Sequence, residues 1–160
     1  MPKIDLAAAP KTRGSDYPPP HGAPFADRLR QRLGDAVGLT QFGVSLTALP
    51  PGGVSSLRHW HEVEDEAVFV LSGELILVEE TGETVLGPGE AAGFKAGVAN
   101  AHHFINRGSA PATYLEIGSR PAADRCHYAD VDLVAHDADG RSWYTRRDGT
   151  ALTEPEDRFP

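Results

Sequence analysis

Short strand-like segments separated by turn residues fill the middle of this 160-residue chain, from Thr40 to Ile117. Phe42, Val44 and Leu46 alternate with small or polar residues, which is the two-residue period of a half-buried β-strand. Glycine and proline mark turns about every ten residues between further segments, at residues 75–78, 84–86, 91–94, 102–106 and 112–117. Many short strands at this spacing predict an all-β sandwich or barrel.

The composition is typical of one globular domain, with 40% hydrophobic and 24% charged residues. The net charge of −8 argues against nucleic acid or an anionic membrane as a partner, although a bound metal could still attract an anionic small molecule. We find no membrane-spanning apolar run and no signal-peptide core. Cys126 is the only cysteine, so we expect a cytoplasmic protein and interpret Cys126 as structural or incidental.

Two histidines lie at a spacing that suits metal binding on a strand. His59 and His61 are two residues apart, so both imidazoles would point to the same face. After the acidic run 62–65, a second strand is predicted to begin at Glu66, which shares its face with Val68 and Val70.

A third strand, predicted at residues 102–106, places His102, Phe104 and Asn106 on one face. Three imidazoles and one carboxylate suit a divalent transition metal (Zn, Mn, Fe, Ni or Co), with one or two coordination positions left open. The alternative is a coincidental polar cluster of histidines at turns. The glutamate offset and the bracketing glycines favour the metal site.

These residues resemble the motifs of the cupin superfamily. The first motif, G-x5-H-x-H-x3-4-E-x6-G, is matched at every fixed position by Gly53, His59, His61, Glu66 and Gly73.

The second motif, G-x5-P-x-G-x2-H-x3-N, is matched between Gly89 and Asn106 with two departures. Lys95 stands where the family usually has proline, and four residues instead of two precede the histidine. Counting back from Asn106 makes His102 the family ligand. The neighbouring His103 is the alternative ligand, but it would lie on the opposite strand face.

The resemblance implies a small antiparallel jelly-roll barrel at residues 41–120. An N-terminal arm (residues 1–40) would precede it, and a C-terminal extension (residues 121–160) would pack on the barrel or on a partner subunit. It also implies a homodimer, to which the aromatic pair Trp143 and Tyr144 could offer an interface edge.

The resemblance also implies roles for individual residues. One divalent transition metal would be held by His59, His61, Glu66 and His102, and Glu66 would also act in catalysis. The inner wall near the metal, where side chains either contact substrate or fill the core, would be formed by Val68, Val70, Phe104 and Asn106. Asn106 is interpreted as a structural hydrogen-bonding residue rather than a catalyst.

A short helix is predicted near the end of the arm, because apolar residues recur at every fourth position from Phe25 to Leu33 and Gly34 follows. Three arginines lie off its apolar line: Arg28, Arg30 and Arg32. They form either an anion-binding patch or a solvated helix face, and we favour the solvated face.

Other polar residues have weaker assignments. Glu62, Glu64 and Asp65 could be extra ligands or a general base, but a solvated turn is the simpler interpretation. Tyr114 and Glu116 share one face of the last barrel strand, and an inward-facing Glu116 would need a partner.

The leading hypothesis is a metal-dependent enzyme acting on a small polar metabolite, with the metal as Lewis acid and template. The reaction could be isomerisation, as in cupins labelled sugar-phosphate isomerases, or a dioxygenase or lyase reaction, and the fold does not select among them. The alternative is a non-catalytic sensor that binds metal or a small ligand, without a DNA-binding helix-turn-helix in this chain.

Overall fold

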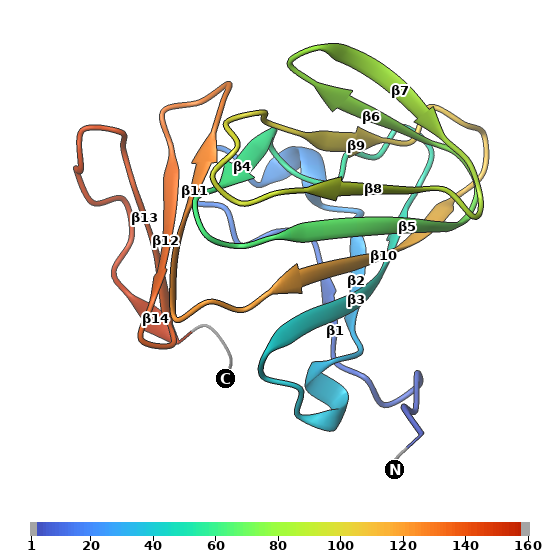
Figure 1. Ribbon diagram of the computed structural model, residues 1–160, viewed down its shortest axis with the longest axis horizontal. Coiled ribbons are helices and arrows are strands. Elements are labelled where there is room, and N and C mark those ends of the chain that lie inside the picture. The colour runs from blue at the N-terminus through green and yellow to red at the C-terminus, as the bar shows by residue number, and fades with distance from the viewer. Residues whose placement is uncertain (1–2, 158–160) are drawn as a thin grey trace.

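The computed structural model describes residues 3–157, so residues 1–2 and 158–160 of the predicted arm and extension lie outside it. Its main strands form three antiparallel sheets (Figure 1). The prediction of an all-β antiparallel jelly-roll fold is confirmed. Among the described residues, no helix is both long enough and apolar enough to cross a membrane.

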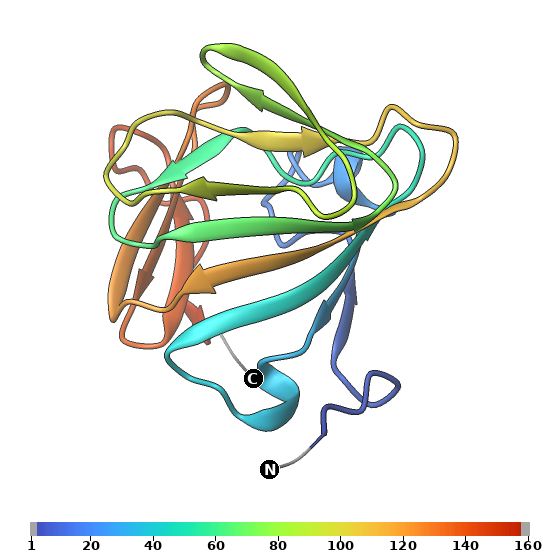
Figure 2. The same cartoon turned by 45° about the vertical axis from the view of Figure 1, so that its right-hand side comes forward.

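The largest sheet has six strands and forms the longest wall of the barrel (Figure 2). In spatial order they are β1 (Lys11–Arg13), β2 (Leu29–Arg32), β3 (Phe42–Leu49), β10 (Ala112–Ser119), β5 (Glu66–Ser72) and β8 (Ala91–Phe94). Two strands from the predicted arm, β1 and β2, thus extend the barrel's own sheet. The register sets Arg30, Thr47, Tyr114 and Val70 in one row across four neighbouring strands.

Two smaller sheets complete the fold. A three-stranded sheet contains β7 (Gly82–Leu86), β6 (Leu75–Glu79) and β9 (His103–Ile105). A five-stranded sheet contains β14 (Glu156–Asp157), β13 (Arg141–Thr145), β12 (Val134–Ala138), β11 (Ala123–Tyr128) and β4 (His59–His61). The C-terminal strands are therefore joined to β4, the strand that carries the histidine pair.

The barrel core follows from the two-residue period of its strands. Val68 and Val70 on β5 are buried, whereas Phe69 between them is 41% exposed. Strands β3, β5, β6, β9 and β10 contribute side chains to one buried hydrophobic cluster. It includes Leu49, Val68, Val70, Leu75, Leu77, Phe104 and Tyr114. Burying each such side chain contributes about 1.5–3 kcal/mol to folding before entropy costs. The cluster therefore stabilises β5, the strand that begins with Glu66.

The predicted helix at residues 25–33 is wrong. The structure has a short 3₁₀ turn, η1 (Ala23–Phe25), and then strand β2, which pairs with β1 on one side and β3 on the other. A second 3₁₀ turn, η2 (Asp35–Val37), follows. Leu29 and Gln31 also alternate with Arg30 and Arg32, so the sequence fits a strand as well as a helix. Pairing with the neighbouring strands decides between them by satisfying the backbone hydrogen bonds.

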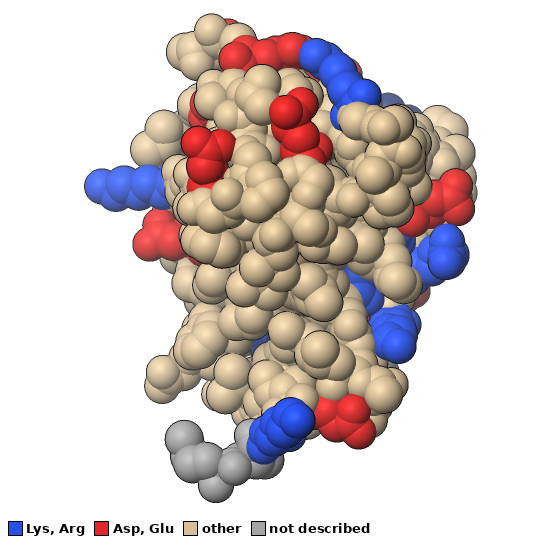
Figure 3. All heavy atoms as spheres, turned by 90° about the vertical axis from the view of Figure 1, so that its right-hand side faces the viewer, with Lys and Arg blue, Asp and Glu red and all other residues tan. Residues whose placement is uncertain are grey.

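The outer surface carries charges of both signs. On the face shown in Figure 3, Lys and Arg side chains lie among Asp and Glu side chains around the edge, and uncharged residues occupy the middle. Charges of opposite sign are thus interspersed on this face.

Candidate metal centre

Three imidazoles converge on one carboxylate inside the barrel. The Nε2 atoms of His59, His61 and His102 lie 3.4, 3.5 and 3.4 Å from Oε2 of Glu66. This Glu66 oxygen is buried and has no hydrogen-bond partner. The structure therefore brings together the four residues that the sequence predicts as metal ligands.

Backbone pairing places these side chains. His59 and His61 lie on β4, and Glu66 begins β5 after a bend. His102 lies just before β9, where its backbone N–H donates to the carbonyl of His59 at 2.8 Å and its carbonyl accepts from the His59 N–H at 3.1 Å. Trp60 lies between the two β4 histidines and stacks on His127 at 4.5 Å.

The other ring nitrogens are held so that Nε2 points inward. His59 Nδ1 lies 2.9 Å from the carbonyl oxygen of Leu57, and His61 Nδ1 lies 2.5 Å from Oδ2 of Asp124. Because these oxygens can only accept, each Nδ1 carries a proton, and in the neutral form of each ring Nε2 presents a lone pair. His102 is fixed instead by stacking on Phe94, with ring centroids 3.4 Å apart.

The charges in the cluster are mutually dependent. Burial alone would raise the pKa of Glu66, but the three histidines outweigh it and hold its pKa well below the usual range. Burial lowers the pKa of His102 and keeps that imidazole neutral, as a metal ligand must be. For His61, burial opposes protonation, yet Cys126, Glu66 and Asp124 together raise its pKa.

The cluster fits a divalent metal ion by its donor set. Ligand atoms of His59, Glu66 and His102 all lie within 4.8 Å of one another. Three imidazole nitrogens and an unpartnered carboxylate oxygen match the ligands that transition metals accept in catalytic sites.

His103, the alternative ligand, lies elsewhere. Its Nδ1 donates to the carbonyl oxygen of Ser56 at 3.1 Å, and its side chain is not among those that meet at Glu66. It follows His102 by one residue, and neighbouring strand residues point to opposite faces. The geometry thus favours His102 for the fourth ligand position.

The cluster opens onto a cavity of about 810 Å³ between the six-stranded and five-stranded sheets. Val68 and Phe104 line this cavity, as expected. Val70 and Asn106 do not line it. Val70 is fully buried in the core, and the Asn106 amide donates to the carbonyls of two core and loop residues, Leu49 and Ala110, both at 2.9 Å. Asn106 is thus a structural residue that fixes a loop.

Strand β11 supplies functional neighbours that the sequence interpretation missed. Asp124, Cys126 and Tyr128 alternate along it, and Cys126 and Tyr128 are register partners of His61 and His59. Cys126 is buried in a second hydrophobic cluster, which fits the structural alternative, and it also lines the cavity beside His59 and His61. Because Arg125 and His127 between them are polar too, the sequence has no alternation that would mark the inward face of this strand.

The acidic run before β5 is only partly a solvated turn. Glu62 and Asp65 are exposed, but Glu64 lines the cavity. Gly118 leaves the space for its side chain, since a Cβ at that position would overlap the Glu64 carboxylate. The backbone N–H of Glu64 donates to Asp124, which ties this residue to the His61 side of the cluster.

The arginines in and directly before β2 line the same cavity, so their interpretation as a solvated helix face is wrong. Arg28, Arg30 and Arg32 all line it. The expectation that an inward Glu116 needs a partner is confirmed, because Arg30 Nη2 lies 2.8 Å from Glu116 Oε2.

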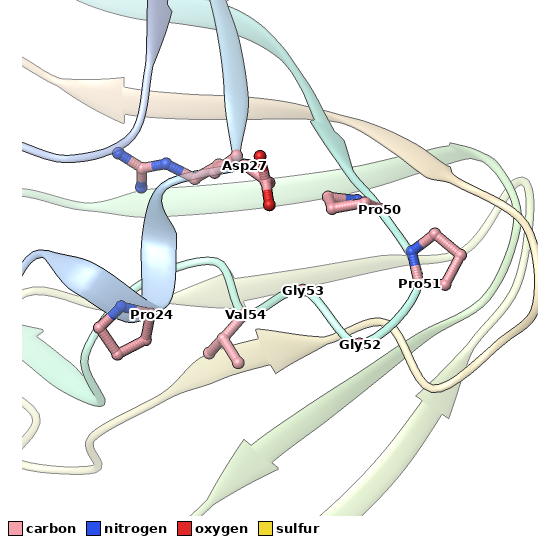
Figure 4. A pocket seen from close by; sticks show the side chains of 8 residues that line it. Pro24, Asp27, Pro50, Pro51, Gly52, Gly53 and Val54 are labelled. Carbon is pink, nitrogen blue, oxygen red and sulfur yellow. The ribbon is translucent and has the colours of Figure 1, made fainter.

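A second, smaller cavity of about 120 Å³ lies apart from the cluster (Figure 4). Mostly proline and glycine residues line it, with Val54 and the charged side chains of Asp27 and Arg28. The histidine–glutamate cluster therefore belongs to the larger cavity alone.

Comparison with known proteins gives the family. The sequence pattern described as Cupin domain matches residues 45–118. A crystal structure from Silicibacter pomeroyi, named sugar phosphate isomerase from a cupin superfamily, is 45% identical with a TM-score of 0.90, covering 95% of this chain and 97% of that one. The chain belongs to the cupin superfamily. The resemblance seen in the two motifs is confirmed.

Other cupin structures are more distant. One from Acidithiobacillus ferrooxidans, whose name gives the same isomerase activity provisionally, is 32% identical with a TM-score of 0.71, covering 81% of this chain and 82% of that one. One from Thermotoga maritima, named a predicted oxalate decarboxylase, is 16% identical with a TM-score of 0.59, covering 74% and 99%, and shares the fold alone. No curated protein matches the chain.

Proposed function

We propose that this cupin is a metal-dependent isomerase acting on a small phosphorylated sugar. The observation that carries the proposal is the convergence of three Nε2 atoms and the Glu66 carboxylate at the wall of a cavity of about 810 Å³. The 45%-identical structure named a sugar phosphate isomerase, which covers nearly the whole chain, supports the reaction class.

The metal would be held by His59, His61, Glu66 and His102. When bound, a divalent ion supplies Lewis acidity that polarises a carbonyl or hydroxyl oxygen of the substrate. Asp124 and the carbonyl of Leu57 orient two of the imidazoles through their Nδ1 atoms.

Isomerisation of an aldose to a ketose needs a group that moves a proton. One carbon loses a proton to a base, its neighbour receives the proton, and the hydroxyl proton passes to the former carbonyl oxygen. Glu66 is a weak base, because its neighbouring histidines hold its pKa well below the usual range. Glu64, two residues before Glu66, also lines the cavity with its carboxylate, and we assign the proton transfer to it.

Tyrosine hydroxyls would position the substrate. Burial raises the pKa of Tyr114 and Tyr128, so both phenols remain protonated donors at neutral pH. Both line the cavity, and the Tyr114 hydroxyl is buried without a hydrogen-bond partner. A substrate hydroxyl would satisfy it, since an unpaired buried hydroxyl is unfavourable.

The test is a panel of aldose and ketose phosphates incubated anaerobically with protein loaded with Mn, Fe, Co, Ni or Zn. ¹H NMR should show interconversion of one aldose–ketose pair that chelation abolishes. Glu64→Gln should reduce the rate on the order of 10²–10⁴-fold, while the exposed neighbour Glu62→Gln leaves it unchanged.

Two outcomes would replace this proposal. Turnover that consumes oxygen and fails without it would indicate a dioxygenase. Tight, reversible binding of one compound without turnover under any metal would indicate the sensor function instead.

A further inference from the structure

Strand β2 presents a row of guanidinium groups to the cavity that holds the histidine–glutamate cluster. Arg30 and Arg32 alternate along the strand and share one face, and Arg28, directly before it, lines the same cavity. Arg28 is committed to structure, because it donates to the carbonyl oxygens of Gly14 at 3.3 and 3.0 Å and of Ser55 at 2.6 Å. It fastens the segment after β1 to the barrel.

Arg30 and Arg32 are less fully engaged. Arg30 contacts Glu116 through one Nη atom, and its Nε is buried without a hydrogen-bond partner. Arg32 lies 4.0 Å from Asp35, which is beyond hydrogen-bond range. Asp35 is also bonded to Arg120 on its other oxygen. Each guanidinium carries five N–H donors, so both retain donors for a ligand in the cavity.

The charge on this wall is positive. Arg28, Arg30, Arg32 and Arg120 all line the cavity; Arg30 faces Glu116, and Asp35 lies between Arg32 and Arg120. The far wall, in contrast, carries acidic residues of the C-terminal strands: Asp137, Glu154, Glu156 and Asp157. An anionic group would therefore be drawn to the β2 side.

The spacing suits a small bifunctional molecule. In the six-stranded sheet, β2 is three strand positions from β5, which carries Glu66. Strands lie about 4.8 Å apart, so the two backbones are separated by roughly 14 Å along a flat sheet. The register sets Arg32 in one row with Ser45, Glu116 and Val68, two residues along β5 from Glu66, and the cavity lies over this span.

We infer that Arg30 and Arg32 bind the phosphate group of a phosphorylated metabolite whose other end lies against the His59–Glu66 cluster. Only the placement of the other end of the ligand, against the histidine–glutamate cluster, rests on the proposed function. Paired guanidiniums match a phosphate dianion in charge and in the geometry of its oxygens. A phosphate oxygen would accept a hydrogen bond from the Nε–H of Arg30, which is buried and has no partner in the protein.

The experiment titrates inorganic phosphate into the purified, full-length protein and follows the arginine Nε–H signals by ¹H–¹⁵N NMR at constant ionic strength. The signals of Arg30 and Arg32 should shift saturably. Arg32→Gln should weaken the apparent phosphate affinity roughly 10- to 100-fold. Arg13→Gln, on β1 with a side chain 64% exposed, is the matched control and should leave the affinity unchanged.

Two further arms separate the possible outcomes. The same shifts should persist in His59→Ala/His61→Ala, which excludes phosphate bound to a metal and keeps the result independent of whether the protein is an isomerase. Because Arg30→Gln alone would leave Glu116 unpaired, it is combined with Glu116→Gln, and this folded double variant should also lose the response. An equal response to acetate, or no saturable shift at Arg30 and Arg32, would overturn the inference.

Discussion

Asp124 is the residue whose replacement most sharply tests how the cluster is held in place. It has no exposed side-chain surface, and it accepts hydrogen bonds from His61 Nδ1 at 2.5 Å, Val63 N at 2.7 Å and Glu64 N at 3.3 Å. It thereby links β11 to both the histidine strand and the loop that carries Glu64.

Asp124→Asn preserves the shape of the side chain but changes the proton on His61. The amide oxygen can still accept from Val63 and Glu64, which leaves the NH₂ group facing His61 Nδ1. That nitrogen must then accept, so the imidazole proton moves to Nε2, the atom directed at Glu66. A protonated Nε2 cannot bind a metal. Loss of an orienting carboxylate typically weakens metal affinity 10- to 100-fold, about 1.4–2.7 kcal/mol, and we expect the upper end here.

The assay is competition with a chromophoric chelator, using the metal found in the purified protein. The control is Asp130→Asn, which makes the same chemical change at another hydrogen-bonded carboxylate. Asp130 accepts hydrogen bonds from Arg58, its side chain is 55% exposed, and it does not contact His61. We expect a large loss of affinity for Asp124→Asn and none for Asp130→Asn, with both variants folded by circular dichroism. Equal affinity in wild type and Asp124→Asn would refute the claim that this hydrogen bond sets the His61 tautomer.

Three further predictions follow from the same geometry. Glu66→Gln should leave the fold intact, weaken metal binding and lower any turnover on the order of 10²–10⁴-fold; unchanged turnover by the assay above would exclude its role. Asn106→Ala should lower the free energy of unfolding by about 2–4 kcal/mol in urea titrations, because it strands buried carbonyls; a change below 0.5 kcal/mol, within the usual range for surface substitutions, would contradict this. We also propose a homodimer through the outer face of the six-stranded sheet, whose partly exposed apolar side chains are Phe42, Phe69, Leu71 and Ile117; sedimentation showing only monomer at micromolar concentration would contradict it.

The parts of the site that the sequence predicts are those encoded by local spacing. His59 and His61 share a face because any strand places alternate residues together, and Glu66 follows at the start of the next strand. The barrel strands were predictable for the same reason, since alternation and turn residues are local properties.

The parts that sequence analysis missed depend on contacts between distant segments. Asp124 contacts His61 although 63 positions separate them in the sequence, and no local motif near either residue predicts this contact. Glu64 points into the cavity only because Gly118, on another strand, leaves room for it. The segment from Phe25 to Leu33 satisfies both the helical and the strand period, so its sequence alone predicts a helix as readily as a strand, and only the pairing of β2 with β3 decides between them.

Metal content tests the central claim most directly. Elemental analysis of the purified wild-type protein should find close to one transition metal ion per chain, and His59→Ala/His61→Ala should contain essentially none. His103→Ala is the matched control, because His103 bonds to the carbonyl of Ser56 and not to the cluster, and it should retain most of the metal. Full metal content in the double variant, or complete loss in His103→Ala, would contradict the assignment of the centre to His59, His61, Glu66 and His102.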